Sequence, residues 1–125
     1  ELLRMCQDIA LNLKSDGKFV TLNSNPISPL LSNKKYGTTI TSDSDLEEGA
    51  GLKVTFWKGK KPTCSFINHF WKKSTYEDHL TQVGFKDIRW IPLHVSEEGK
   101  QAFEEGFWDD YLKSPPLIIL EATKI

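Results

Sequence analysis

The sequence lacks the features that mark several broad classes of protein. Its two cysteines, Cys6 and Cys64, match no zinc spacing, so we expect reduced, mostly buried thiols rather than a disulfide framework or zinc site. The longest apolar runs fall far short of the ~18 residues that a membrane-spanning helix needs. No signal-peptide pattern is present at the start of the sequence. These absences predict a cytoplasmic protein that does not enter a membrane.

An excess of either charge is also lacking. Sixteen basic and seventeen acidic residues leave a net charge of −1. Nucleic-acid-binding proteins usually carry a basic excess or stripe, so we do not expect nucleic acid as a partner. The dense cationic cluster of Lys58, Lys60 and Lys61 surrounds Gly59 and precedes Pro62, a pattern that is typical of a solvated turn.

Helices alternate with strands along the 125 residues. Apolar residues at helical spacing predict a helix over residues 1–13, which Gly17 would close in a left-handed turn. Ser74 and Glu77 form a capping box for a second helix, and a third is predicted from Ser96 to about residue 106. Apolar alternation or short apolar runs predict strands over residues 18–23, 51–57, 63–71, 85–91 and 117–120.

The connection over residues 24–51 is rich in Ser and Thr, and we expect it to be mostly irregular, with a short helical turn near Leu30 and Leu31. The two strands that follow it form a hairpin. The order of elements predicts an α/β fold with a partial doubly wound, Rossmann-like sheet that is mostly parallel and contains this inserted β-hairpin.

The first residue, Glu1, already belongs to the apolar helical pattern, and no initiator Met precedes it. Three core strands also make a small sheet for a doubly wound fold. We therefore expect the chain to be part of a longer protein.

Three motifs resemble those of class I S-adenosylmethionine-dependent methyltransferases, in the family's order. The helix, Leu13-Lys14-Ser15-Asp16-Gly17 and strand are similar to the family's "helix, L-K-P-G-G, strand" passage, with Ser15 and Asp16 replacing Pro and Gly. The stretch from Tyr76 to Phe85 resembles its "Y-x-x-x-L-x-x-A-G-F" joint. Residues 115–122 are similar to its last strand. The Tyr36-Gly37 pair and the aromatic hairpin resemble the small-molecule branch.

The resemblance covers essentially the whole chain and implies the C-terminal part of a methyltransferase domain over residues 1–125, with a last strand that runs antiparallel. Residues 24–71 would be a loop and hairpin insertion, a candidate lid over the methyl acceptor. The glycine-rich turn that binds S-adenosyl-L-methionine would lie upstream of Glu1, so this chain alone would be inactive and would contribute no cofactor-binding residue. Gly49-Ala50-Gly51 precedes a strand and has no helix after it, unlike a cofactor loop.

Polar and aromatic side chains supply the candidate site. His69, on a hairpin strand, is the candidate base or acceptor-orienting group, with a packing histidine as the alternative. Five hairpin aromatics exceed what an inert hairpin needs, and either an apolar acceptor pocket or simple packing explains them: Phe56, Trp57, Phe66, Phe70 and Trp71. The candidate acceptor-binding residues are Asn23, Asn25, Tyr36, Phe56, Trp57, Phe70 and Trp71, with ordinary turn chemistry as the alternative for Asn25.

Two functions from different classes follow. The first is an enzyme that transfers a methyl group from S-adenosylmethionine to a small, partly apolar acceptor, with this chain supplying the acceptor side. The alternative is a non-catalytic α/β binding module with an apolar pocket or a protein-docking surface. A partial sheet would also expose the edge of its first strand, through which a homodimer or strand exchange would form.

Overall fold

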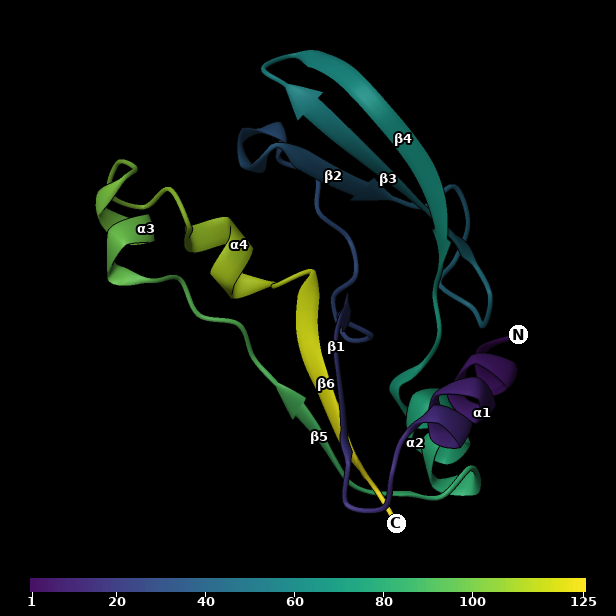
Figure 1. Ribbon diagram of the computed structural model, residues 1–125. Helices are drawn as coiled ribbons and strands as arrows, with labels where there is room; N and C mark the ends of the chain where they lie inside the picture. Colours follow the sequence, from purple (N-terminus) through teal and green to yellow (C-terminus); the bar gives the residue numbers. More distant parts are fainter. The chain divides into compact units, whose positions relative to one another are not determined.

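The computed structural model describes all residues from 1 to 125 and consists of two compact units, each built on a three-stranded sheet. Unit 1 comprises Glu1–Asn23, Lys73–His94 and Leu117–Ile125. Unit 2 comprises Ser24–Lys72 and Val95–Pro116. Each unit therefore assembles segments that are far apart in the sequence (Figure 1).

Unit 1 has its C-terminal strand in the middle of the sheet. Its elements are α1 (Leu2–Asn12), β1 (Lys18–Ser24), α2 (Lys73–Gln82), β5 (Phe85–Ile91) and β6 (Leu117–Lys124), and the strand order is β1-β6-β5. Strand β6 runs antiparallel to β5, and its end lies beside the start of β1, where the Lys124 N–H donates to the Gly17 carbonyl at 2.8 Å. The expected antiparallel last strand is confirmed.

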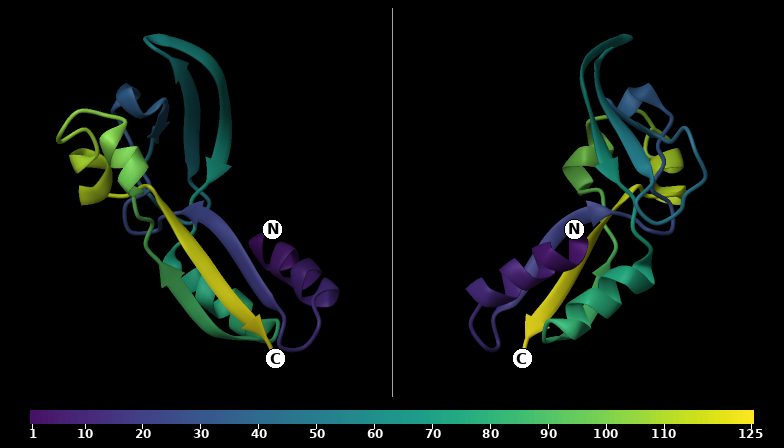
Figure 2. Two further views of the ribbon diagram at one scale, coloured as in Figure 1. Left: turned by 60° about the vertical axis from the view of Figure 1, so that its left-hand side comes forward. Right: turned by 90° about the vertical axis from the view of Figure 1, so that its right-hand side faces the viewer.

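Both helices of unit 1 lie on the same face of its sheet (Figures 1 and 2). On that face Phe85, Leu120 and Ala122 are 2%, 1% and 0% exposed, and Cys6 and Leu80 of the helices are also buried. The Phe19 and Phe85 rings lie 6.3 Å apart. Burial of these apolar side chains between helices and sheet stabilises the unit.

The other face and the outer edge of this sheet are open. Val20 and Leu22 of the edge strand β1 are 56% and 59% exposed. A groove of about 900 Å³ between α1 and β1 is lined by Met5, Ile9 and Phe19 among others. The first strand therefore lies at a sheet edge, and the dimer or strand exchange through that edge stays a prediction.

Unit 2 contains a sheet whose strands follow one another along the chain. Its elements are η1, a 3₁₀ turn (Lys34–Tyr36), β2 (Thr38–Thr41), β3 (Gly51–Lys58), β4 (Lys61–His69), α3 (Glu97–Gln101) and α4 (Asp109–Lys113). The order is β2-β3-β4 and both pairings are antiparallel, so the predicted hairpin is confirmed as β3 and β4. The core consists of Leu31, Ile40, Leu52, Val54 and Phe70.

The prediction of a mostly parallel sheet is wrong. Strand β6 lies between β1 and β5, so neither of those strands has a parallel neighbour. The hairpin does not join that sheet either, because β3 pairs with β2 and β4 in a sheet of its own. The mixed α/β composition was predicted correctly, but the expected parallel layer does not form.

Several local predictions also need correction. Residues 24–51 are mostly irregular, as predicted, but the helical turn is η1 at Lys34–Tyr36 rather than near Leu30 and Leu31, and the strand β2 was not expected. Ser74 lies inside α2, which begins at Lys73, and the Glu77 carboxylate accepts from the Trp90 indole N–H at 2.9 Å rather than building the predicted capping box. The left-handed residue after α1 is Asp16, not Gly17. Ser96 caps α3 as expected, but that helix ends at Gln101.

The open face of the unit 1 sheet carries an ion-pair network that crosses its three strands. The Glu121 carboxylate of β6 accepts from the Arg89 guanidinium of β5 and lies 3.3 Å from the Lys18 ammonium of β1. The hydrogen bond from Arg89 is the main cause that lowers the pKa of Glu121, and Lys18 adds to it. The carboxylate joins the three strands electrostatically.

We expect Arg89→Gln to raise the pKa of Glu121 toward its ordinary value near 4.5, as followed by carbon NMR of the carboxyl group. The lowered pKa means that the stabilisation by Glu121 is present above that ordinary value and is lost as the pH falls through the folded-state pKa. Arg4→Gln, on the exposed side of α1, is the control. An unchanged Glu121 midpoint in Arg89→Gln would contradict the assigned cause.

Candidate acceptor-binding site

The register of the hairpin sorts its side chains onto two faces. Directly opposed residues share a face, and the pairs Val54–Phe66 and Phe56–Cys64 lie on the face that includes the buried Ile40. We call this the core-side face. The opposite, outer face carries the pairs Lys53–Ile67, Thr55–Ser65 and Gly51–His69.

The core-side face extends beyond the part that the core covers. Val54 is 9% exposed, whereas its neighbours Phe56 and Phe66 are 42% and 47% exposed. Their ring centroids lie 6.0 Å apart at an interplanar angle of 44°. Every residue of the edge strand β4 is exposed, and about half of each of these two rings remains accessible. We call the pair the Phe56–Phe66 patch.

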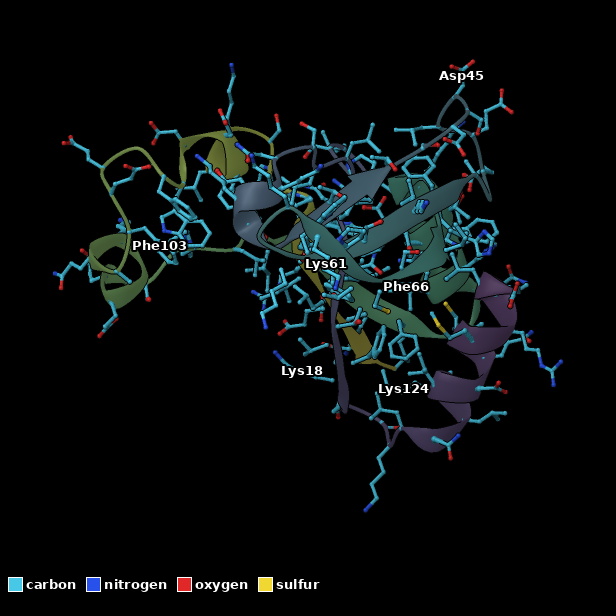
Figure 3. The ribbon with its side chains drawn as sticks, turned by 90° about the horizontal axis from the view of Figure 1, so that it is seen from above. Lys18, Asp45, Lys61, Phe66, Phe103 and Lys124 are labelled. Atoms are coloured by element: carbon cyan, nitrogen blue, oxygen red, sulfur yellow. The ribbon has the colours of Figure 1, made fainter.

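The tip of the hairpin adds positive charge to the same face. A bulge between Phe56 and Trp57 leaves Trp57 opposite Pro62 and Lys58 opposite Lys61. Alternation along β3 then places Lys58 on the face of Phe56, with Lys61 beside it. Figure 3 shows Lys61 and Phe66 along β4. Residues 59 and 60 form a solvent-exposed turn, as predicted, and the lysines on either side of it share a face with the patch.

Two predicted aromatic contacts have structural partners instead of an open surface. Trp57 lies toward the outer face, where its indole N–H donates to the Thr39 hydroxyl at 2.8 Å and the Lys34 ammonium lies 4.1 Å from its ring centroid. Phe70 is 6% exposed and belongs to the unit 2 core. Both residues therefore have the packing contacts of the alternative, and their role in binding an acceptor stays a prediction.

His69 ends β4 on the outer face. Its Nδ1 lies 3.2 Å from the Gly49 carbonyl oxygen, which can only accept, so Nδ1 carries a hydrogen and the lone pair of the neutral ring is on Nε2. The half-buried Trp71 ring packs beside Gly49 as well. The structure thus brings His69 and Trp71 together at Gly49 and places them apart from the Phe56–Phe66 patch.

The two candidate asparagines have intramolecular partners. The Asn23 carboxamide oxygen in β1 accepts from the Tyr76 hydroxyl at 3.5 Å. Asn25 is 7% exposed; its Nδ2 donates to the Pro115 carbonyl at 2.9 Å and its Oδ1 accepts from the Ile27 N–H at 3.1 Å. Asn25 therefore ties the turn after β1 to the chain before β6.

Tyr36 belongs to an aromatic cluster that the sequence did not reveal. Its hydroxyl donates to the Phe107 carbonyl at 2.7 Å and accepts from the Tyr111 N–H at 3.2 Å. The rings of Phe107 and Tyr111 both lie 5.3 Å from its own. The cluster consists of Tyr36, Phe103, Phe107, Trp108 and Tyr111, and it joins η1 to the segment around α3 and α4.

Grouped metal-ligating side chains and glycine-rich turns are the features that would hold a metal ion or a cofactor. No three His, Cys, Asp or Glu side chains are grouped to hold a metal. Gly49, with a φ of +80°, donates its N–H to the Phe70 carbonyl, and Gly51 begins β3, so this glycine pair precedes a strand and is not followed by a helix.

Cys64 is exposed on β4, unlike the expected buried thiol, and Cys6 is buried. None of the helices is long and apolar enough to cross a membrane.

Comparison with known proteins identifies the type of fold. No family model matches the chain, and no curated protein matches it. Among solved structures, the chain is similar to a protein from Listeria monocytogenes that is provisionally assigned as an S-adenosylmethionine-dependent methyltransferase, with a TM-score of 0.62 and 17% identity. The match covers 100% of this chain and 55% of that one. The chain therefore has a methyltransferase-like fold and spans about half the length of this neighbour.

We expect Tyr36→Phe to lower the free energy of unfolding by about 1–2 kcal/mol, because the change removes one hydroxyl that both donates and accepts. Urea unfolding measures the loss. Hydrogen exchange at the Tyr111 amide should accelerate in the variant. Unchanged exchange at Tyr111 would show that the hydroxyl does not anchor α4 and would favour the predicted role of Tyr36 as a ligand contact.

Proposed function

We propose that the protein transfers a methyl group from S-adenosylmethionine to a small, partly apolar acceptor, and that this chain supplies the acceptor side. The observation that carries the proposal is the structural similarity to a methyltransferase over the whole chain. The antiparallel strand β6 between β1 and β5 supports it, because the sequence resemblance implied an antiparallel last strand. We propose that this enzyme acts in the cytoplasm.

The Phe56–Phe66 patch is the surface that we propose for the apolar part of the acceptor. Ligand sites are mostly apolar with a few polar groups that fix orientation. Two adjacent, half-exposed rings at the margin of a core give a small molecule an apolar surface to pack against. The hairpin thus serves as the acceptor lid, within the insertion over residues 24–71.

The cofactor half of the site requires polypeptide that this chain does not contain. A glycine-rich turn between a strand and a helix lets backbone amides approach such a cofactor. The Gly49–Gly51 segment does not provide this geometry, since it continues directly into β3. We propose that the motif lies upstream of Glu1.

Titration calorimetry with S-adenosylmethionine tests this division of roles. The natural polypeptide that contains this chain should bind the cofactor, and residues 1–125 alone should bind it far more weakly. If neither binds, the methyltransferase proposal fails and the non-catalytic binding module becomes the better account. If both bind equally, the cofactor site lies within this chain and the upstream assignment is wrong.

A separate test concerns His69, whose role as the candidate base stays a prediction. Nε2 is the atom available to take a proton from the acceptor. We expect His69→Gln to lower kcat by on the order of tenfold or more with little change in KM. His94→Gln, an exposed histidine in the segment before α3, is the control. An unaltered kcat in His69→Gln would leave His69 with only its contact to Gly49.

A further inference from the structure

We infer that the core-side face of the hairpin binds an acceptor that carries an anionic group, such as a carboxylate or phosphate, on an apolar body. The inference rests on the proposed function, because it names the class of acceptor for the same site. Two features carry it: the half-exposed Phe56–Phe66 patch and the unpaired positive charge at the hairpin tip.

The hairpin region contains no acidic residue over a long stretch. Between Glu48 and Glu77 the chain has six lysines and neither Asp nor Glu: Lys53, Lys58, Lys60, Lys61, Lys72 and Lys73. The four lysines of the hairpin form no ion pair, and among the six only Lys73 does, with Glu77. In a chain of net charge −1, this hairpin is a local positive surface.

The register places two of these charges where they would meet a ligand on the patch. Lys58 and Lys61 are paired with each other, and they lie on the core-side face with Phe56 and Phe66. Lys58 is two residues along β3 from Phe56, which is about 7 Å. An acceptor that packs its apolar part on the rings therefore presents an anionic group to two ammonium groups at that separation.

The charge distribution favours a small anion over a nucleic acid. Nucleic-acid-binding domains commonly neutralise several phosphates and have a pI above about 9. This chain has a pI near 6.3. Two rings and two lysines on one face suit a ligand of one ring system and one anionic group.

Matched probes and variants test the inference in the natural polypeptide without cofactor. The probes are 2-naphthoate and its neutral counterpart 2-naphthamide, and binding is followed through the amide shifts of Phe56 and Phe66 in nitrogen–proton NMR. Naphthoate should bind more tightly. Lys58→Gln combined with Lys61→Gln should weaken naphthoate binding by on the order of tenfold, since each exposed pair contributes roughly two- to fivefold, and leave naphthamide nearly unchanged.

Two control variants lie on the outer face of the same strands. Lys53→Gln removes the same charge from β3, and Ile67→Ser removes a 59% exposed apolar side chain from β4. Both should leave naphthoate affinity within about twofold, whereas Phe66→Ser should weaken both probes several-fold. Because neither cofactor binding nor turnover is measured, failure of this test and failure of the methyltransferase proposal are separate results.

Three results would overturn the inference. Equal affinity for the two probes would show that charge is not recognised. A loss in Lys53→Gln as large as that in the Lys58 and Lys61 variant would reduce the effect to general electrostatic attraction. Shifts of Phe56 and Phe66 that depend on protein concentration without any probe would show that a second copy of the chain covers the patch.

Discussion

Strand β6 is the constraint on which unit 1 depends, because it alone has a neighbour on each side. It pairs with β5 over the range from Phe85–Lys124 to Ile91–Ile119, and its end bonds to the start of β1. Strands β1 and β5 do not pair with each other, so without β6 neither has a partner strand. Leu120 and Ala122 of this strand are 1% and 0% exposed. The same strand therefore provides the backbone pairing of the sheet and part of the buried core.

The sheet of unit 2 forms between strands that are neighbours in the sequence. Strands β2, β3 and β4 pair in chain order, so its sheet needs no crossover. Its core occupies only part of the sheet, and β4 remains exposed along its whole length. Burial of apolar surface stabilises a protein by about 25 cal/mol per Å². Leaving Phe56 and Phe66 half exposed forgoes that stabilisation, which is the physical reason to look for a ligand on them.

The sequence predicted the elements with a strong apolar period and missed those without one. Strand 85–91 was predicted with its observed bounds, because Gly84 precedes it and Pro92 closes it. Strand β2 was missed because Thr38–Thr41 has one strongly apolar residue, Ile40, and takes its partners from β3. The capping box failed because Glu77 is held by Trp90, thirteen residues away, a tertiary contact that no local pattern contains.

The candidate site shows the same division between local and distant information. Strand alternation places Phe56 and Phe66 on one face of the hairpin and His69 on the other. The sequence prediction nevertheless treated these residues as one site. Tyr36 was chosen as a loop residue that closes over a ligand. Its hydroxyl bonds to Phe107 and Tyr111, more than seventy residues away, and the sequence offered no signal for that contact.

The charge of the hairpin explains why bulk composition was a poor guide to this surface. The net charge of −1 is the sum of a positive, lysine-rich hairpin and of acidic segments elsewhere, from Asp43 to Glu48 and from Glu97 to Asp110. The Debye length is about 8 Å at physiological salt, so a bound ligand interacts mainly with the charges that lie within that distance of it, and not with the net charge of the chain. At Lys58 and Lys61 those charges are positive and lack carboxylate partners. Balanced composition therefore argues against long-range attraction of a polyanion, but it leaves local recognition of one anionic group fully available to this face.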